Sequence, residues 1–255
     1  MGRSCCETQH LVGRMLDHIV LVTSNLRQDA EWLADRTGIS GTYGGHNPVN
    51  GTHNMLFPLS AGAYLELLAA DEQRPATAER ALPFGLDQMT GRSVAAWAAR
   101  VADFDATVSL ARAHGVPLGD LAHMSRRRPD GHELRWRMTY PLDREPERLC
   151  PFLIDWGSTE HPTAGLDRTR FLAVTEFTTL SPVPYEVERW LAVLGLRGDL
   201  AVAGSDLCGF NLTVRGPDGI VALRGDNGRP EGLVGDRSGS QPTAKAGEET
   251  EGEDE

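Results

Sequence analysis

The sequence has no run of about 18 or more apolar residues, the length that a helix needs to cross a bilayer. Its first 14 residues, MGRSCCETQHLVGR, also lack the apolar stretch of a secretory signal. With 255 residues, of which 40% are hydrophobic, the chain can still bury a sizeable core. We therefore expect a folded cytoplasmic protein that does not associate with membranes.

Cysteine is scarce, and the positions of the four cysteines exclude the usual patterns. Cys5 and Cys6 belong to a leader, residues 1–14, that we expect to be flexible, whereas Cys150 and Cys208 stand alone in strand-like segments. Neither a disulfide framework nor a zinc motif fits this spacing, so we expect reduced thiols. Met15 opens the first patterned segment, which leaves open whether residues 1–14 belong to the native protein.

Motifs of several functional classes are missing as well. The glycine-rich stretch Gly38–Gly51 has neither the GxGxxG spacing nor the Lys-Ser/Thr ending of phosphate-binding loops. Ser158–His161 contains the residue types of a hydrolase triad but no nucleophile elbow. The formal net charge is −11, so the excess of basic residues typical of nucleic-acid binding is absent.

Much of the negative charge lies at the end of the chain. The last eight residues, EETEGEDE, carry six acids, and without them the formal net charge is −5. From Gly225 onward Gly, Ser, Pro, Glu and Asp dominate, so few apolar residues remain to offset the entropy of ordering the chain. We predict a disordered acidic tail over residues 225–255, which leaves residues 15–224 as the folded part.

Within the folded part, a pattern of strand, helix and further strands recurs three times. The expected elements span residues 16–22, 26–37, 52–59 and 63–69, then 94–101, 104–114, 134–140 and 151–156, then 171–180, 184–194, 209–214 and 220–223. Strands at hairpin spacing follow each helix, which fits repeated βαβββ units better than a doubly wound sheet. We predict an α+β fold of repeated βαβββ units that form cupped mixed β-sheets with helices packed outside. A domain of two units would span residues 15–165, and a third βαβββ-like unit would span residues 166–224.

Four segments carry a resemblance to a known family. They are LDHIVLVTSNL at 16–26, GTHNMLFPLSAGAYLELLA at 51–69, SRRRPDGHELRWR at 125–137 and PFLIDWGSTEHP at 151–162. Together they resemble the glyoxalase-like domain branch of the vicinal oxygen chelate superfamily over about residues 16–165. The superfamily contains isomerases, lyases, ring-cleaving dioxygenases, resistance proteins and metal-free binders, so the resemblance does not select a reaction.

The resemblance implies a divalent metal site. A His on the first strand and a Glu on the fourth strand of a unit commonly hold the metal in this superfamily, and His18 and Glu66 match those positions. Imidazole and carboxylate suit Zn, Ni, Mn or Fe. His53 precedes Glu66 by thirteen residues, and a hairpin could bring the two close together, so His53 is a third candidate ligand.

The internal repeats test this assignment in two ways. Aligning the third unit with the first places Phe210 under His53 and Leu223 under Glu66, so the scaffold can fill these positions with apolar residues. That alignment favours a functional role for the ionisable residues. The second unit weakens the case, because Ala96 falls under His18 and only Asp155 remains as a carboxylate near the last strand. His132, His161 and Glu176 could substitute as ligands, but no spacing selects them.

Structural explanations for the same residues stay open. His18 could be a hydrogen-bonded core histidine, and His53 could order the preceding loop. Glu66 lies between two leucines, where an unpaired carboxylate would be costly and would require a cation or an Arg, or it could instead turn to solvent.

A basic segment offers a second candidate site. Arg135 and Arg137 flank Trp136 with a period of two, so both guanidinium groups would point to one face of a strand. Two such groups could bind a carboxylate or phosphate of a substrate, with Trp136 lining the cavity. The alternative is a solvated face, or ion pairs with Glu66, Asp155 or Glu133.

The sequence thus predicts a metal-dependent glyoxalase-like lyase or isomerase acting on a small, oxygen-rich and anionic molecule. His18, His53 and Glu66 would hold the metal, Glu66 or Asp155 would move a proton, and Arg135, Arg137 and Trp136 would bind the substrate. The alternative is a non-catalytic protein that binds or sequesters a small molecule. We expect a small-molecule partner and neither nucleic acid nor membrane, with a homodimer left open.

Overall fold

The order of secondary structure repeats in this computed structural model, which describes residues 15–73, 82–128, 130–198 and 200–226. In that part of the chain a strand, an α-helix and three further strands follow one another three times. The first unit comprises β1 (Leu16–Thr23), α1 (Leu26–Thr37), β2 (Thr42–Asn47), β3 (Thr52–Pro58) and β4 (Tyr64–Ala70). The second comprises β5 (Arg92–Arg100), α2 (Phe104–Ala113), β6 (Leu121–Arg127), β7 (Glu133–Thr139) and β8 (Phe152–Asp155). The third comprises β9 (Ala173–Ser181), α3 (Pro184–Val193), β10 (Ala201–Gly204), β11 (Gly209–Arg215) and β12 (Ile220–Asp226). The predicted α+β fold of repeated βαβββ units is confirmed.

Local sequence explains where the first two helices begin and end. The Asn25 side chain accepts a hydrogen bond of 3.1 Å from the Gln28 N–H at the start of α1, and Asp103 does the same for α2. These are the residue types that satisfy free N–H groups at a helix start. Gly38 ends α1 with a φ of 71°, which glycine adopts without strain.

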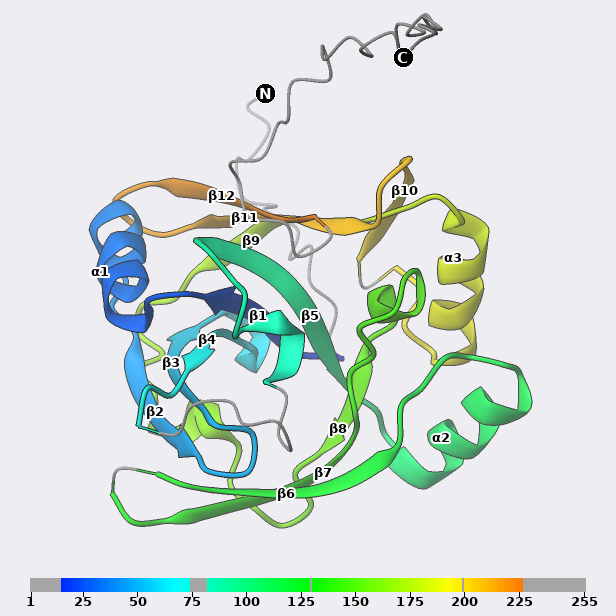
Figure 1. Cartoon of the computed structure of the whole chain (residues 1–255), viewed down its shortest axis with the longest axis horizontal. Helices are drawn as coiled ribbons and strands as arrows, with labels where there is room; N and C mark the ends of the chain where they lie inside the picture. Colours follow the sequence, from blue (N-terminus) through cyan, green and yellow to red (C-terminus); the bar gives the residue numbers. More distant parts are fainter. Residues whose placement is uncertain (1–14, 74–81, 129, 199, 227–255) are drawn as a thin grey trace, which may run out of the picture.

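The first two units form one eight-stranded sheet in the order β2-β3-β4-β1-β5-β8-β7-β6. In each unit the first strand runs parallel to the last one, β1 beside β4 and β5 beside β8. The two units join through the antiparallel pair of β1 and β5. The sheet curls into a cup whose edge strands β2 and β6 lie close to each other (Figure 1).

The third unit repeats the element order but has a different topology. Its four-stranded sheet has the order β10-β9-β11-β12, so the first strand β9 lies between β10 and β11 and the last strand β12 pairs with β11 alone. Phe210 and Leu223 therefore do not occupy the positions of His53 and Glu66. The sequence alignment between the third and first units compares residues that the fold does not superpose, because equal element order does not fix strand order.

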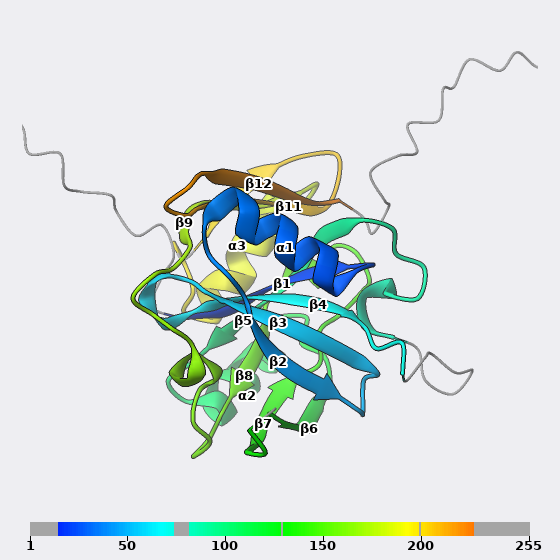
Figure 2. The same cartoon turned by 90° about the vertical axis from the view of Figure 1, so that its left-hand side faces the viewer.

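The smaller sheet and the helices cover the outer face of the large sheet (Figures 1 and 2). Helix α1 packs on β3, β4 and β12, and the four-stranded sheet lies against β5. The main hydrophobic core fills this layer, with Trp97 of β5 in edge contact with Phe177 of β9. A second apolar cluster lies inside the cup. Burying apolar area on both faces of the sheet is the main favourable contribution to this arrangement.

Three strands were not expected from the sequence, namely β2, β6 and β10. Strand β2 reads TYGGHN and lies in the glycine-rich stretch 38–51, where glycine weakens the pattern of a strand. It pairs with β3 through an irregular register at Tyr43–Gly45. Strands β2 and β6 are the edges of the large sheet, where alternation of apolar and polar residues is weak.

The predicted leader at 1–14 and nearly all of the predicted tail at 225–255 lie outside the described residues. Strand β12 extends to Asp226, two residues beyond the expected boundary of the folded part. Among the described residues, no helix is both long and apolar enough to span a bilayer.

Candidate functional site

A cavity lies inside the cup formed by the first two units. Strand register directs His18, Tyr64 and Glu66 to this inner face, because His18 pairs with Tyr64, and Val20 pairs with Glu66, in the parallel strands β1 and β4. The second unit closes the cavity with aromatic and apolar side chains. They are Trp136, Met138, Phe152, Ile154 and Trp156.

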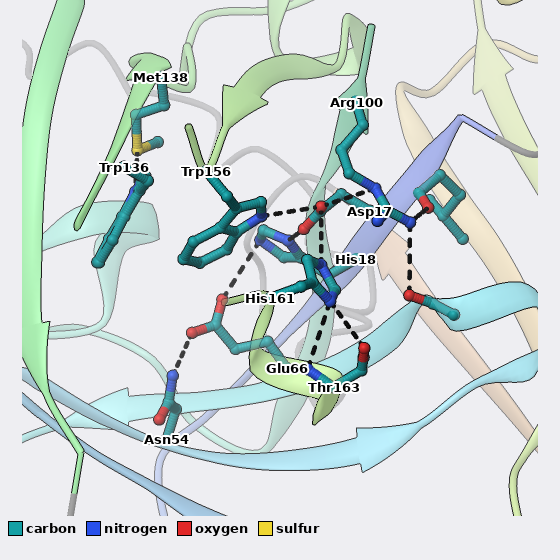
Figure 3. Close-up of polar contacts among 12 residues, drawn as sticks. Asp17, His18, Asn54, Glu66, Arg100, Trp136, Met138, Trp156, His161 and Thr163 are labelled. Carbon is teal, nitrogen blue, oxygen red and sulfur yellow. Dashed lines mark hydrogen bonds and ion pairs between the residues drawn. The ribbon is translucent and has the colours of Figure 1, made fainter. Parts of the chain in front are cut away.

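A chain of polar groups runs from the core to this cavity (Figure 3). The Nδ1 atom of His18 lies 2.6 Å from Asp17 Oδ1, and the Nε2 atom lies 3.6 Å from Glu66 Oε2. The His18 ring stacks on Tyr64 with 4.7 Å between centroids. Burial raises the pKa of Tyr64 well above its usual value, so its hydroxyl stays neutral beside the histidine. Asp17 thus holds His18 with Nε2 facing Glu66.

Asp17 is fully buried and collects four partners. Besides His18, it contacts Trp156 Nε1 at 3.0 Å, His161 Nε2 at 3.1 Å and Arg100 Nε at 3.1 Å (Figure 3). Burial alone would raise the pKa of Asp17, but hydrogen bonds from His161 and His18 outweigh it and hold the pKa far below its usual range. The charged carboxylate links β1 of the first unit to β5, to the end of β8 and to the segment that follows.

Glu66 belongs to a second polar row that crosses the cup. Its Oε1 atom accepts a hydrogen bond from the Asn54 amide, and Asn54 Oδ1 accepts one from Arg126 Nη1 at 2.5 Å. Arg126 is on β6, only 6% exposed, and its Nε has no hydrogen-bond partner among the described residues. The row connects the edge strand β6 to β3 and β4, and it leaves a buried cation on the cavity wall.

The structure separates His53 from the other two predicted metal ligands. His53 is next to Asn54 on β3, and neighbouring side chains of a strand point to opposite faces. The residue borders the cavity, but its ring stacks on His46 of β2 with 5.9 Å between centroids. His18, His53 and Glu66 therefore do not converge. His18 meets Glu66 on the inner face, and His53 joins His46 and Asp71 on the outer face.

The second group has its own hydrogen bonds. His46 Nδ1 lies 2.7 Å from Asp71 Oδ2, and the Tyr43 hydroxyl lies 2.7 Å from His46 Nε2. Burial is the main cause that lowers the pKa of His53. Desolvation would raise the pKa of Asp71, but hydrogen bonds from His46 and from the Gln73 N–H lower it overall. These directions favour the neutral form of His53 and the charged form of Asp71.

The predicted arginines are engaged by carboxylates. Arg135 Nη2 lies 2.7 Å from Glu133, and Arg137 contacts Asp155 and Asp105, each at 2.8 Å. These ion pairs are the alternative that the sequence left open. Asp155 does not line the inner cavity with Glu66, whereas Trp136 does and packs on Trp156 with 5.2 Å between ring centroids.

The inner site offers fewer protein ligands than a catalytic zinc ion usually has. Ala98 pairs with Phe152 as His18 pairs with Tyr64, and two positions further on β8 has Ile154 where β4 has Glu66. The second unit thus supplies apolar residues at these positions, and His18 and Glu66 are the two donors. Arg126, which lines the same cavity, adds a positive charge near these two donors.

Sequence reasoning missed Asp17, Asn54, Arg126, His46 and Asp71 as members of these sites. Asp17 is adjacent to His18 in the sequence, which was an available signal for a carboxylate that orients a histidine. Arg126 lies in the segment SRRRPDGHELRWR, where nothing in the sequence distinguishes it from the neighbouring arginines. Asn54, His46 and Asp71 come together through the pairing of β2 with β3 and of β3 with β4, and β2 was an unexpected strand.

The sheet topology and the cavity inside the cup identify the class of fold to which the protein belongs. A cupped sheet from two βαβββ units joined through their first strands is the vicinal oxygen chelate fold. The family model described as glyoxalase-like domain matches residues 16–195, which is more than half of the chain. The chain therefore belongs to the glyoxalase-like domain family.

The chain is similar to several proteins of solved structure. A hypothetical protein from Staphylococcus aureus is 18% identical, with a TM-score of 0.53, over 83% of this chain and 85% of that one. Methylmalonyl-CoA epimerase from Mycobacterium tuberculosis is 23% identical, with a TM-score of 0.40, over 59% and 92%. A methylmalonyl-CoA epimerase variant from Streptomyces coelicolor is 22% identical, with a TM-score of 0.40, over 55% and 95%. At these identities the likeness concerns the fold alone. No curated protein matches the chain.

Proposed function

We propose that the inner cavity binds a small molecule bearing a carboxylate or a similar oxyanion, and that Glu66 and His18 move a proton on it. The reaction class would be an isomerase or lyase that proceeds through an enolate-like state. Arg126 would bind the anionic group and offset the charge that develops on it, Glu66 would remove the proton from carbon, and His18 Nε2 would accept that proton from Glu66 and pass it back.

The observation that carries this proposal is Arg126. Its guanidinium is buried and forms no ion pair with a described carboxylate, and its neighbour Asn54 is neutral. A buried charge without a counterion is costly, so an anionic ligand would gain a strong charge-assisted contact there. Asn54 also separates Arg126 from Glu66, which leaves the carboxylate free of a direct ion pair with it.

The arrangement of His18 supports proton transfer near that anion. Asp17 accepts a hydrogen bond from Nδ1, which fixes the tautomer with Nε2 directed to the cavity. Glu66 is 18% exposed in its side chain and reaches the same space. A carboxylate and an oriented imidazole on one wall can take a proton from one position of a substrate and support its return at another.

Metal dependence through His18 and Glu66 stays a prediction from the family resemblance. The two-donor set supports proton transfer by the side chains themselves. A second candidate function, binding without catalysis, is favoured by the apolar residues that the second unit presents to the cavity. In that case the same anionic ligand would bind unchanged.

The test uses two measurements on the same protein. Isothermal titration against small 2-oxo and 2-hydroxy carboxylates, with the matching amides as controls, measures binding. Nuclear magnetic resonance in D2O then follows deuterium entry beside the carbonyl of any carboxylate that binds. We expect carboxylates but not amides to bind, and Glu66→Gln to retain binding while exchange falls by about 10²- to 10⁴-fold.

The outcomes separate the enzyme from the sequestering protein and test the role of Glu66. Binding without exchange in the parent would favour the sequestering protein over the enzyme. Exchange that persists in Glu66→Gln would remove Glu66 from the reaction. Repeating the exchange after treatment with a chelator tests the metal-dependent version, because proton transfer by side chains alone should survive chelation.

A further inference from the structure

We propose that His46, His53 and Asp71 form a binding site for a divalent transition metal ion on the outer face of the large sheet, apart from His18 and Glu66. Zinc is the expected ion, and cobalt and nickel should substitute for it. Nothing in the proposed inner-cavity function depends on this site.

The strand pairings bring the three side chains together. His46 is on β2, His53 is its register partner on β3, and Asp71 directly follows β4. Each residue offers one ligand atom, and these atoms lie within 4.8 Å of one another. Ligands held about 2.0–2.2 Å from a zinc ion lie about 3–4 Å apart, so a small contraction completes the site. The exposed His46 can move, while the buried Asp71 stays fixed.

The donor set fits a borderline transition metal. Two imidazoles and one carboxylate are typical of zinc sites that keep an open position, whereas magnesium and calcium prefer oxygen ligands. The alternative is a hydrogen-bonded cluster that only ties β2 to the end of β4. That alternative explains His46 and Asp71, which contact each other at 2.7 Å, but it gives His53 no role.

His53 is the observation that favours a ligand. Its half-buried imidazole forms no hydrogen bond or ion pair with any described residue, although it stacks on His46 beside the charged Asp71. A metal ion would use the unpaired nitrogen. His53 and Tyr43 also line a groove beneath α1, together with Ala30 and Met55, so an outside ligand could reach the open position of the ion.

The experiment uses the full chain with Cys5 and Cys6 replaced by Ser in every sample, so that these thiols cannot bind metal. Metal-stripped protein is titrated with Co²⁺, and the visible absorption of the bound ion reports the nitrogen and oxygen ligand set. We expect about one ion per chain. Affinity should fall in His46→Ala, His53→Phe and Asp71→Asn by at least the roughly 10- to 100-fold that loss of an outer contact costs a metal site.

Two matched variants make the result specific. His132→Ala removes a surface histidine that lies 3.3 Å from Asp130, the same residue pairing without a third ligand, and it should leave binding unchanged. Glu66→Gln alters the inner cavity and should leave Co²⁺ binding unchanged too. Zn²⁺ should raise the midpoint of thermal unfolding in these two proteins but not in His46→Ala, because binding stabilises the folded state.

Several outcomes would overturn the site. They are the absence of Co²⁺ binding, binding that survives in His53→Phe and His46→Ala, and binding lost only in Glu66→Gln. If Asp71→Asn fails to fold, the two histidine variants still decide, since His46 is exposed and its replacement leaves the core intact.

Discussion

The two halves of the cup share one topology but carry different chemistry. In the first half, β1 to β4 supply Asp17, His18, Asn54 and Glu66 to the inner site. In the second half, the matching strands β5 and β8 present Ala98, Phe152 and Ile154, while β6 and β7 supply Arg126 and Trp136. One half provides groups that can exchange protons, and the other provides an apolar wall with one cation.

This difference shows that a duplicated scaffold does not imply a duplicated site. A symmetric metal site would need ligands from both halves of the cup. A site with acid–base groups on one wall and a cation for an anionic ligand on the other needs two halves with different side chains. The comparison also explains why Asp17 matters to both halves, because it accepts hydrogen bonds from Trp156 and His161 and pairs with Arg100.

The largest expected effect tests this link between the halves. Asp17→Asn should lower the free energy of unfolding by about 3–5 kcal/mol, because it removes a buried charge that compensates Arg100 and orders His18 and His161. Urea unfolding near neutral pH measures the loss. Asp130→Asn is the control, since that carboxylate pairs on the surface with His132 and Arg128.

The same variant has a pH signature. The pKa of Asp17 is lowered on folding, so its contribution is complete above the unfolded value of about 3.9 and is lost as the pH falls below it. The parent should therefore lose stability on acidification more steeply than Asp17→Asn. Equal slopes, or a neutral-pH loss no larger than in Asp130→Asn, would contradict the role assigned to Asp17.

The next effect concerns the anion site proposed at Arg126. Arg126→Met should weaken binding of a small carboxylate ligand by about 1.5–3 kcal/mol, the usual value for hydrogen bonds to charged groups, while the protein stays folded. A double variant, Arg135→Gln with Arg137→Gln, is the comparison, measured by the same titration. If the double variant loses binding and Arg126→Met does not, the predicted arginine pair binds the anion.

A smaller effect tests how the third unit meets the cup. A Cβ atom at Gly225 of β12 would overlap the carbonyl oxygen of Val94 on β5. Gly225→Ala should therefore cost about 1–3 kcal/mol of stability, measured by thermal or urea unfolding. Gly204→Ala is the matched control, because nothing lies closer than 4.0 Å to a Cβ at that position. Similar stability of both variants would argue against close packing of β12 on β5.

The smallest effect is expected on the surface of the second half. Arg135 is 74% exposed in its side chain and pairs with Glu133, so Arg135→Gln should change the free energy of unfolding less than any of the variants above. Urea unfolding at low and high salt measures it, and screening should remove most of the difference. A larger loss that persists at high salt would mean that Arg135 has a structural role beyond this ion pair.

Much of the fold could be predicted because its signals are local. The apolar run LDHIVLV, the cap at Asn25 and the glycine at Gly38 depend on neighbours in the chain, and the predicted strand β1 and helix α1 follow from them. The weakly patterned edge strands β2 and β6 escaped prediction. That omission also concealed Arg126 and His46, because each reaches its site only through the pairing of its strand.

The sequence by itself determined the α+β class, the repeated element order and the position of His18 and Glu66 in otherwise apolar strands. It could not determine which side chains meet, because a side chain's face depends on register and its partners depend on strand order in the sheet. Only the tertiary structure directed His53 away from His18 and Glu66 to His46 and Asp71, and gave the third unit a different topology. It also placed Arg126 across the cup, 72 residues along the chain from Asn54, since contacts at such a separation arise only when the sheet curls.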